Sequence, residues 1–298
     1  MYLIVGASSF IGRHLYEYCK ISGIDVYGTF FTHSYCSDWI KFDICQQKIQ
    51  DIYCKFFSGK KLDAVIICSG NSSIDSCKKN ENESYCINVL CMKKLLTDVE
   101  QLGAKCVFLS SEAVFDGKTG LYTEEDNPNP MALYGRQKLE MEQYMMQNLK
   151  NYLIFRISRA VGSCYGEADI FHEFYSKIVK QEEIVCLKNQ SFCITEVNDI
   201  AKVIIKSLEE GIRGLFHLSS RNYVSRFELA HLYARKIFGG YHKITEKQYS
   251  EIPFIDFRHI YGGLDGSKLA ELISFQYMGT KEIIERYACS MPDLQALK

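Results

Sequence analysis

The sequence predicts an α/β protein: a Rossmann-type, doubly wound parallel sheet with a smaller C-terminal lobe. Three observations support this prediction. The chain has 298 residues, of which 47% are hydrophobic, so a sizeable core is available. Short apolar runs alternate with segments of helical spacing, the pattern of parallel strands joined by helices. A glycine-containing turn separates the first apolar run from the first helical segment.

Five short runs in the first half are apolar throughout and are expected to be buried strands. They cover residues 2–5, 25–29, 64–68, 106–110 and 152–157. Continuous apolar character, rather than alternation, is typical of strands that are covered by helices on both faces. Two segments with helical spacing, 11–21 and 133–149, are expected to supply part of that cover.

The second half is less regular. Its patterns predict helices over 171–180, 199–209 and 226–238 and a strand over 214–218. We therefore expect a Rossmann domain over 1–162 and a smaller lobe over 163–298, with Rossmann elements interleaved around 197–238.

Composition excludes several classes of protein. Lys and Arg number 35 against 36 Asp and Glu, and this balance argues against a nucleic-acid binder. No apolar run approaches the ~18 residues that cross a bilayer. The 13 cysteines are scattered, without a Cys-x-x-Cys pair, so we expect free thiols, no metal site and a cytoplasmic location.

The turn after the first run has the spacing of a phosphate-binding loop. Gly6 and Gly12 bracket it, and the residues between them include Ser8, Ser9, Phe10 and Ile11. A tight turn from strand to helix presents backbone N–H groups to a pyrophosphate. Ser9 stands where a glycine usually lets the backbone approach the phosphates, so the loop alone is a weak signal.

A second pattern is typical of proton transfer. Tyr134 and Lys138 are four residues apart at the start of a predicted helix and share one face. A nearby ammonium would lower the pKa of the tyrosine towards the working pH. The strand ending in Ser110 and Ser111 could place a hydroxyl beside the phenol.

Together these motifs resemble the extended short-chain dehydrogenase/reductase family, in particular its dTDP-4-dehydrorhamnose reductase branch. Residues 109–117 are similar to the branch's Ser-Thr-Asp-Tyr-Val-Phe-Asp-Gly, and 134–138 to its Tyr-Gly-x-x-Lys. Residues 190–195 and 198–200 resemble the segment that lines the sugar-nucleotide pocket, and 263–269 the C-terminal Leu-Asp-x-Ser-Lys-Leu.

The resemblance implies a role for each matching residue. Tyr134 would be the general acid at the sugar C4 oxygen, Lys138 would hold the nicotinamide ribose, and Ser111 would bind the substrate carbonyl. The implied cofactor-binding residues are Gly6, Ser8, Ser9, Phe10, Ile11, Gly12, Arg13, Thr29, His33, Asp43, Ile44, Cys68, Ser69, Gly70, Asn88, Tyr134 and Lys138. The implied substrate-binding residues are Ser110, Ser111, Glu112, Ala113, Phe171 and Thr195.

One position separates the reactions of this family. Dehydratases of the family carry an Asp-Glu pair directly after the catalytic hydroxyl, whereas this chain has Glu112-Ala113. Epimerising reductases have a cysteine acid/base at the position of Ala113. Because a methyl group cannot exchange a proton, we expect neither elimination nor epimerisation.

The expected cofactor is NADP, with NAD as an alternative. NAD-specific sites usually carry an acid at the end of the second strand, and none occurs here before Asp38. Arg13 and His33 could instead meet a 2′-phosphate.

The resulting hypothesis is an NADP-dependent reductase of a 4-keto-6-deoxy nucleotide sugar, and the resemblance implies a homodimer. Two alternatives stay open. One is a 4-epimerase that retains NAD, and the other is a non-catalytic, cofactor-binding regulatory subunit, which the serine in the phosphate loop slightly favours.

Overall fold

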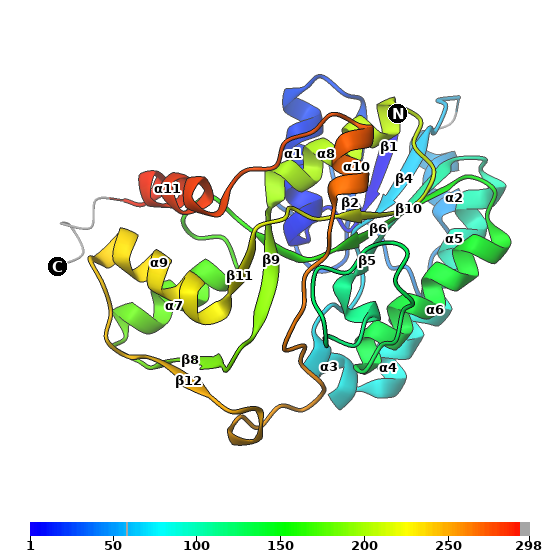
Figure 1. Ribbon diagram of the computed structural model, residues 1–298. Helices are drawn as coiled ribbons and strands as arrows, with labels where there is room; N and C mark the ends of the chain where they lie inside the picture. The colour runs from blue at the N-terminus through cyan, green and yellow to red at the C-terminus, as the bar shows by residue number, and fades with distance from the viewer. Residues whose placement is uncertain (58, 293–298) are drawn as a thin grey trace.

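Seven parallel strands form the central sheet of the computed structural model, which describes residues 1–57 and 59–292 (Figure 1). Their order is β10-β6-β5-β4-β1-β2-β3. The expected α/β fold is confirmed. The strands are β1 (Tyr2–Val5), β2 (Val26–Phe30), β3 (Ile40–Lys41), β4 (Ala64–Ile67), β5 (Lys105–Ser111), β6 (Tyr152–Ile157) and β10 (Gly214–Leu218).

Helices cover both faces of this sheet, as the apolar runs predicted. One face packs against α1 (Phe10–Ile21), α8 (Val197–Glu209) and α10 (Ser267–Leu272). The other face packs against α2 (Ile49–Phe56), α5 (Met92–Gln101) and α6 (Leu133–Asn148). Each layer buries its own aliphatic cluster, which fixes the helices on the sheet.

The order in which strands are added to the sheet reverses at β1. From β1 it runs through β2 to β3 on one side, and β4, β5, β6 and β10 follow on the other. In open α/β sheets a ligand binds beyond the carboxyl ends of the strands at such a switch point. The ends of β1 and β4 are therefore the place at which a binding site is expected.

Three short helices connect β4 to α5. They are α3 (Ile74–Lys79), α4 (Glu81–Tyr85) and a π-helical segment, η1 (Cys86–Cys91), which continues directly into α5. A single 3₁₀ turn, η2 (Glu112–Val114), follows β5.

The C-terminal lobe lies beside the sheet domain (Figure 1). Its core contains aromatic residues from helices α7 (Ile170–Val179), α9 (Arg226–Phe238) and α11 (Thr280–Ser290). Two small sheets complete it: β7 (Arg159–Val161) with β9 (Ser191–Glu196) and β11 (Tyr223–Ser225), and β8 (Ile184–Leu187) with β12 (Ile244–Lys247).

Elements after 162 divide between the two parts. Helix α8 packs on α1 and β10 pairs with β6, so both lie in the sheet layers. Helix α9, by contrast, packs on α7 in the lobe. Rossmann elements of this stretch therefore end at β10 rather than continuing to residue 238.

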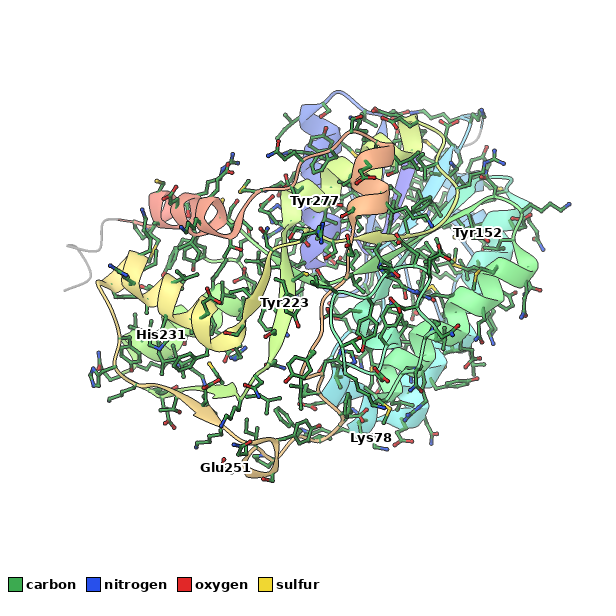
Figure 2. All side chains as sticks on the ribbon, in the orientation of Figure 1. Lys78, Tyr152, Tyr223, His231, Glu251 and Tyr277 are labelled. Carbon is green, nitrogen blue, oxygen red and sulfur yellow. A yellow bond between two sulfur atoms is a disulfide. The ribbon has the colours of Figure 1, made fainter. Side chains whose placement is uncertain are left out.

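The segment after η3 (Tyr249–Glu251) runs from the lobe back to the sheet domain. Figure 2 marks its start with Glu251 and the nearby α3 with Lys78. Arg258 in this segment forms an ion pair with Asp75 of α3 at 2.7 Å, and Asp256 accepts a hydrogen bond from the backbone of Leu133. These contacts join the segment to α3 and to the start of α6.

The expectation that every cysteine is a free thiol is wrong at one pair. Cys45 and Cys91 form a disulfide across 46 residues of sequence, and the other eleven cysteines are free. Their spacing carries no signal because the two residues meet only when the turn after β3 packs against η1. No helix in the described ranges has the length and apolar character to span a membrane.

Candidate active site

The turn after β1 is built around close backbone approaches. Gly6 has φ +85°, and a Cβ there would lie 2.9 Å from Ser69 at the end of β4. A Cβ on Gly12 would lie 2.3 Å from the carbonyl oxygen of Gly6. Only glycine fits both positions, so the turn stays tight against the ends of β1 and β4.

Ser9 occupies the N-cap of α1. Its side chain accepts a hydrogen bond of 3.1 Å from the backbone N–H of Gly12, with extended backbone at Ser9. This is the standard role of an N-cap serine and explains why the loop tolerates it. Phe10 and Ile11 follow in the first turn of α1, at the end of a helix that attracts anions.

Two adjoining cavities lie at the switch point. The larger, about 610 Å³, is lined by the β1, β2 and β3 ends and by η1; the smaller, about 270 Å³, lies above α6 and β5. Both are lined by Ser69 and Gly70. Together they form a crevice that crosses the ends of β1 and β4.

The crevice collects most of the predicted cofactor residues. The larger cavity contacts Gly6, Thr29, Asp43, Ile44, Ser69 and Gly70. The smaller contacts Ser9, Phe10, Ile11, Cys68, Ser69, Gly70, Ser110, Ser111, Tyr134 and Lys138. Neither is lined by Ser8, Gly12, Arg13, His33, Asn88, Glu112, Ala113, Phe171 or Thr195.

One polar group in this crevice fits a bound ligand. The hydroxyl of Ser69 is buried and has no hydrogen-bond partner among the described residues. Buried hydroxyls are normally satisfied, so an orphan at the meeting point of the two cavities suits a group that a cofactor would supply.

The three predicted catalytic side chains come together in the smaller cavity. Ser111 ends β5, while Tyr134 and Lys138 lie in the first turns of α6. The Lys138 ammonium donates to the backbone carbonyl of Leu109 at 2.7 Å and lies 5.7 Å from the Tyr134 ring centre. Helical spacing of four residues therefore does place both groups at one site.

Burial shifts the pKa of both groups. The pKa of Lys138 is lowered to about 8, because burial disfavours its charge more than Glu142 stabilises it. The pKa of Tyr134 is raised, mainly by burial, with hydrogen bonding to Ser111 opposing the shift. The expected lowering of the tyrosine pKa is therefore absent in this state, and the phenol is protonated at neutral pH.

Gly135 allows the catalytic helix to touch η2. A Cβ at this position would lie 1.9 Å from the carbonyl oxygen of Ala113. The hydroxyl of Ser111 accepts from the backbone N–H of Ala113 at 3.2 Å. The backbone of Ala113 thus contacts both Ser111 and α6 and fixes their relative positions.

Asn88 supports the site without lining it. Its amide group exchanges hydrogen bonds with the backbone N–H and C=O of Asn71, at 2.8 and 2.9 Å, and donates to Gln137 of α6 at 2.8 Å. Gln137, which the sequence did not single out, donates in turn to Ser84. Asn88 therefore fixes the turn after β4 relative to the catalytic helix.

Ser110 is committed to a buried network. Its hydroxyl donates to Glu142 at 2.5 Å, and Glu142 is paired with Arg156 at 2.7 Å. Ser111 is consequently the hydroxyl that remains available to a substrate carbonyl.

Two predicted substrate contacts are wrong. Phe171 is fully buried in the lobe and stacks on Tyr233 with ring centres 5.3 Å apart. Thr195 is also fully buried, and its hydroxyl accepts from the backbone N–H of Ser220 at 2.9 Å. Phe171 is packed in the core of the lobe, and the hydroxyl of Thr195 is bonded to a backbone group. Neither side chain is therefore exposed to a substrate.

Glu112 and Arg13 each have a structural partner. Glu112 accepts from the backbone N–H of Gly263 at 2.7 Å, which ties η2 to the C-terminal segment. Arg13 pairs with Glu167 at 2.5 Å, and its guanidinium lies 5.6 Å from the ring of Tyr35. Arg13 therefore lies beside the loop that follows β2, where His33 is exposed.

The sequence reasoning missed Arg159. This exposed residue begins β7, two positions beyond β6, and its guanidinium packs over the ring of Phe192 at 4.6 Å. The charged side chains near its guanidinium come from both parts of the molecule. They belong to Glu112, Arg226, Glu173 and Arg258. The sequence feature that could have identified Arg159 is its position directly after a predicted strand, at the carboxyl edge of the sheet.

The sequence is similar to that of known proteins along most of its length. The family described as RmlD substrate binding domain matches residues 1–289, and the chain belongs to that family. Methionine adenosyltransferase 2 subunit beta of Xenopus laevis is 25% identical over 243 residues, 76% of this chain and 69% of that protein. The dTDP-4-dehydrorhamnose reductase of Sinorhizobium fredii is 29% identical over 198 residues, 62% of this chain and 64% of that protein.

A solved structure gives the same fold. The dTDP-4-dehydrorhamnose reductase of Bacillus anthracis, in complex with NADP, superposes with a TM-score of 0.82 at 23% identity. The match covers 97% of this chain and 99% of that one.

Proposed function

We propose that this protein is an NADP-dependent reductase of a 4-keto-6-deoxy nucleotide sugar. The observation that carries the proposal is the convergence of Ser111, Tyr134 and Lys138 on one cavity that adjoins the glycine turn. The dTDP-4-dehydrorhamnose reductases among its relatives support the same chemistry.

The residues of the crevice fit a dinucleotide. Asp43 and Ile44 would contact the adenosine half, the first turn of α1 would face the pyrophosphate, and Ser69 would gain a partner. When bound, the reduced nicotinamide supplies the hydride. Lys138 would hold the ribose hydroxyls beside it.

Tyr134 and Ser111 would act on the substrate carbonyl, one as proton donor and the other as hydrogen-bond donor. The protonated phenol of Tyr134 donates to the sugar C4 oxygen, and its raised pKa keeps it in the required form. The Ser111 hydroxyl binds the same oxygen and orients it. Because no second acid/base follows Ser111, the ring carbons next to C4 keep their protons.

A non-catalytic role is the second candidate, since methionine adenosyltransferase 2 subunit beta of Xenopus laevis matches 76% of the chain. One assay distinguishes the catalytic function from the regulatory one. The chain is mixed with NADPH and, in turn, with dTDP-, UDP-, GDP- and CDP-linked 4-keto-6-deoxy sugars, and NADPH absorbance is followed. We expect turnover with one nucleotide; NADPH binding without turnover on any of them would favour the regulatory role.

A further inference from the structure

Three cysteines meet at the wall of the larger cavity. Cys45 lies in the turn after β3, and Cys86 and Cys91 are the first and last residues of η1. Each sulfur lies within 4.8 Å of the other two. No residue of this cluster takes part in the proposed reduction.

The backbone explains why the three thiols meet. Hydrogen bonding in a π-helix joins residues five apart, which brings Cys86 over Cys91 with their sulfurs 3.8 Å apart. The Cα atoms of Cys45 and Cys91 are 4.9 Å apart, within the range that a disulfide spans, and the two residues are bonded. Cys91 can therefore pair with either neighbour.

Accessibility differs across the cluster. Cys86 is exposed, Cys45 is half-buried, and Cys91 is 3% exposed. An oxidant in solution consequently meets Cys86 first, while Cys91 lies behind it.

We propose that Cys45, Cys86 and Cys91 form a thiol–disulfide site that is oxidised by peroxides and that controls the affinity for the dinucleotide. The coupling to the dinucleotide rests on the proposed function, whereas the thiol chemistry stands on the cluster alone.

Oxidation proceeds in three balanced steps. The Cys86 thiolate attacks a peroxide oxygen, the O–O bond breaks, and a sulfenic acid and one water form. The Cys91 thiolate attacks the Cys86 sulfur and releases the second oxygen as water. The Cys45 thiolate then attacks the Cys91 sulfur, so the Cys45–Cys91 bond forms and Cys86 leaves as a thiolate. Cys45 and Cys91 lose two electrons, hydrogen peroxide becomes two waters, and Cys86 is regenerated.

The bond acts on a wall of the adenosine cavity. Cys45 and Cys86 line that cavity together with Asp43 and Ile44. The turn is also held by local hydrogen bonds. The backbone N–H of Cys45 donates to Asp43 and that of Asp43 donates to Gln47, both at 2.8 Å, and the backbone N–H of Gln47 donates to the carbonyl of Asp43 at 2.9 Å.

The same bond reaches the opposite wall. It joins the turn to η1, where Asn88 holds the backbone of Asn71. Asn71 lines the cavity as well. Oxidation thus preorganises both sides of the adenosine site, and we expect the oxidised protein to bind NADPH more tightly than the reduced one.

The thiol chemistry is tested first. The full chain is reduced, exposed to hydrogen peroxide, alkylated and mapped by peptide mass spectrometry. We expect a Cys45–Cys91 peptide, formed several-fold more slowly in Cys86→Ser and at the normal rate in the control Cys54→Ser, which removes an exposed thiol outside the cluster. Absence of a Cys45 disulfide, or one Zn²⁺ per chain protecting all three thiols, would overturn the site in favour of other chemistry.

The coupling is tested by binding rather than turnover. NADPH is titrated into reduced and oxidised protein, and we expect a Kd at least about fivefold lower after oxidation, the lower end of common coupling strengths. Cys45→Ser should show one Kd under both conditions. Equal Kd values in the wild type overturn the coupling. If neither form binds NADPH, the coupling and the proposed function fail together, while the peptide map still decides the thiol chemistry.

Discussion

Burial acts in opposite directions on the two central residues of the site. It keeps Tyr134 protonated, which suits a proton donor, and it brings the pKa of Lys138 to about 8, close to physiological pH. The sequence placed both groups on one helix face but could not show their burial, which depends on how α6 packs against β5. The direction of the tyrosine shift was therefore not predictable from spacing.

Tyr134→Phe should remove nearly all turnover and leave NADPH affinity unchanged. The phenyl ring keeps the packing and deletes only the proton donor, and general acid catalysis typically contributes ~10²–10⁴-fold. Steady-state rates and an NADPH titration check this, with Tyr85→Phe, an exposed tyrosine, as control. Retained activity in Tyr134→Phe would place the acid elsewhere.

The pH dependence should report Lys138. Its pKa is lowered to about 8, so the ammonium is present below that pH and is lost as the pH rises through it. We expect kcat/KM for NADPH, which reflects the free enzyme, to fall above pH 8. Lys138→Arg, whose guanidinium stays charged, should be less active but lack this inflection. A wild-type profile that is flat to pH 10 would contradict the assignment.

Arg13 tests the choice of dinucleotide. Its guanidinium lies beside Tyr35 in the loop after β2, and no carboxylate ends that strand. We expect the wild type to favour NADPH over NADH in kcat/KM and Arg13→Ala to lose that preference. Lys20→Ala, in the last turn of the same helix, should behave as the wild type. An NADH preference in the wild type would refute the NADP assignment.

At the scale of elements, apolar runs predicted the sheet closely. β1 and β6 have the predicted bounds, and β2, β4 and β5 begin or end within one residue of them. The π-helical η1 and the short strands of the lobe had no such signal, because they depend on pairing with distant segments. The prediction that Phe171 contacts the substrate failed for a related reason. A pattern match identifies a helix but does not show which of its faces packs into the core.

The contact between α6 and η2 is the tightest of these element contacts at the site. Gly135→Ala would drive a methyl group into the Ala113 carbonyl, so one element must shift. We expect a loss of about 1–3 kcal/mol in the free energy of unfolding and lower kcat, since Ser111 and Tyr134 move apart. Gly279→Ala, where a Cβ has open space, is the matched control. Thermal unfolding and steady-state rates measure both; an unchanged Tm would show that the elements absorb the methyl group.

For the whole molecule, the described crevice lies in the sheet domain, and the lobe is joined to that domain at the same edge. The sheet domain holds the proposed dinucleotide crevice and the catalytic residues, and its assembly was largely predictable because strand order places motif-bearing turns at one edge. The way in which the lobe is joined to that edge was not predictable from the sequence, because it depends on where separate segments of the chain return to the sheet domain. Glu112 with Gly263 and Arg258 with Asp75 make two of these junctions.

Arg159 provides the test at this scale. It is exposed where charges of the lobe and of the sheet domain meet, and no ion pair engages it among the described residues. A substrate diphosphate would supply the missing anion through charge-assisted hydrogen bonds. Arg159→Ala should raise KM for the nucleotide sugar at least ~tenfold and leave the Kd for NADPH unchanged, since one such contact is worth about 1.5–3 kcal/mol. Arg213→Ala, an exposed arginine at the amino end of β10, should alter neither value. If Arg159→Ala instead weakened NADPH binding and spared KM for the sugar, Arg159 would belong to the cofactor site.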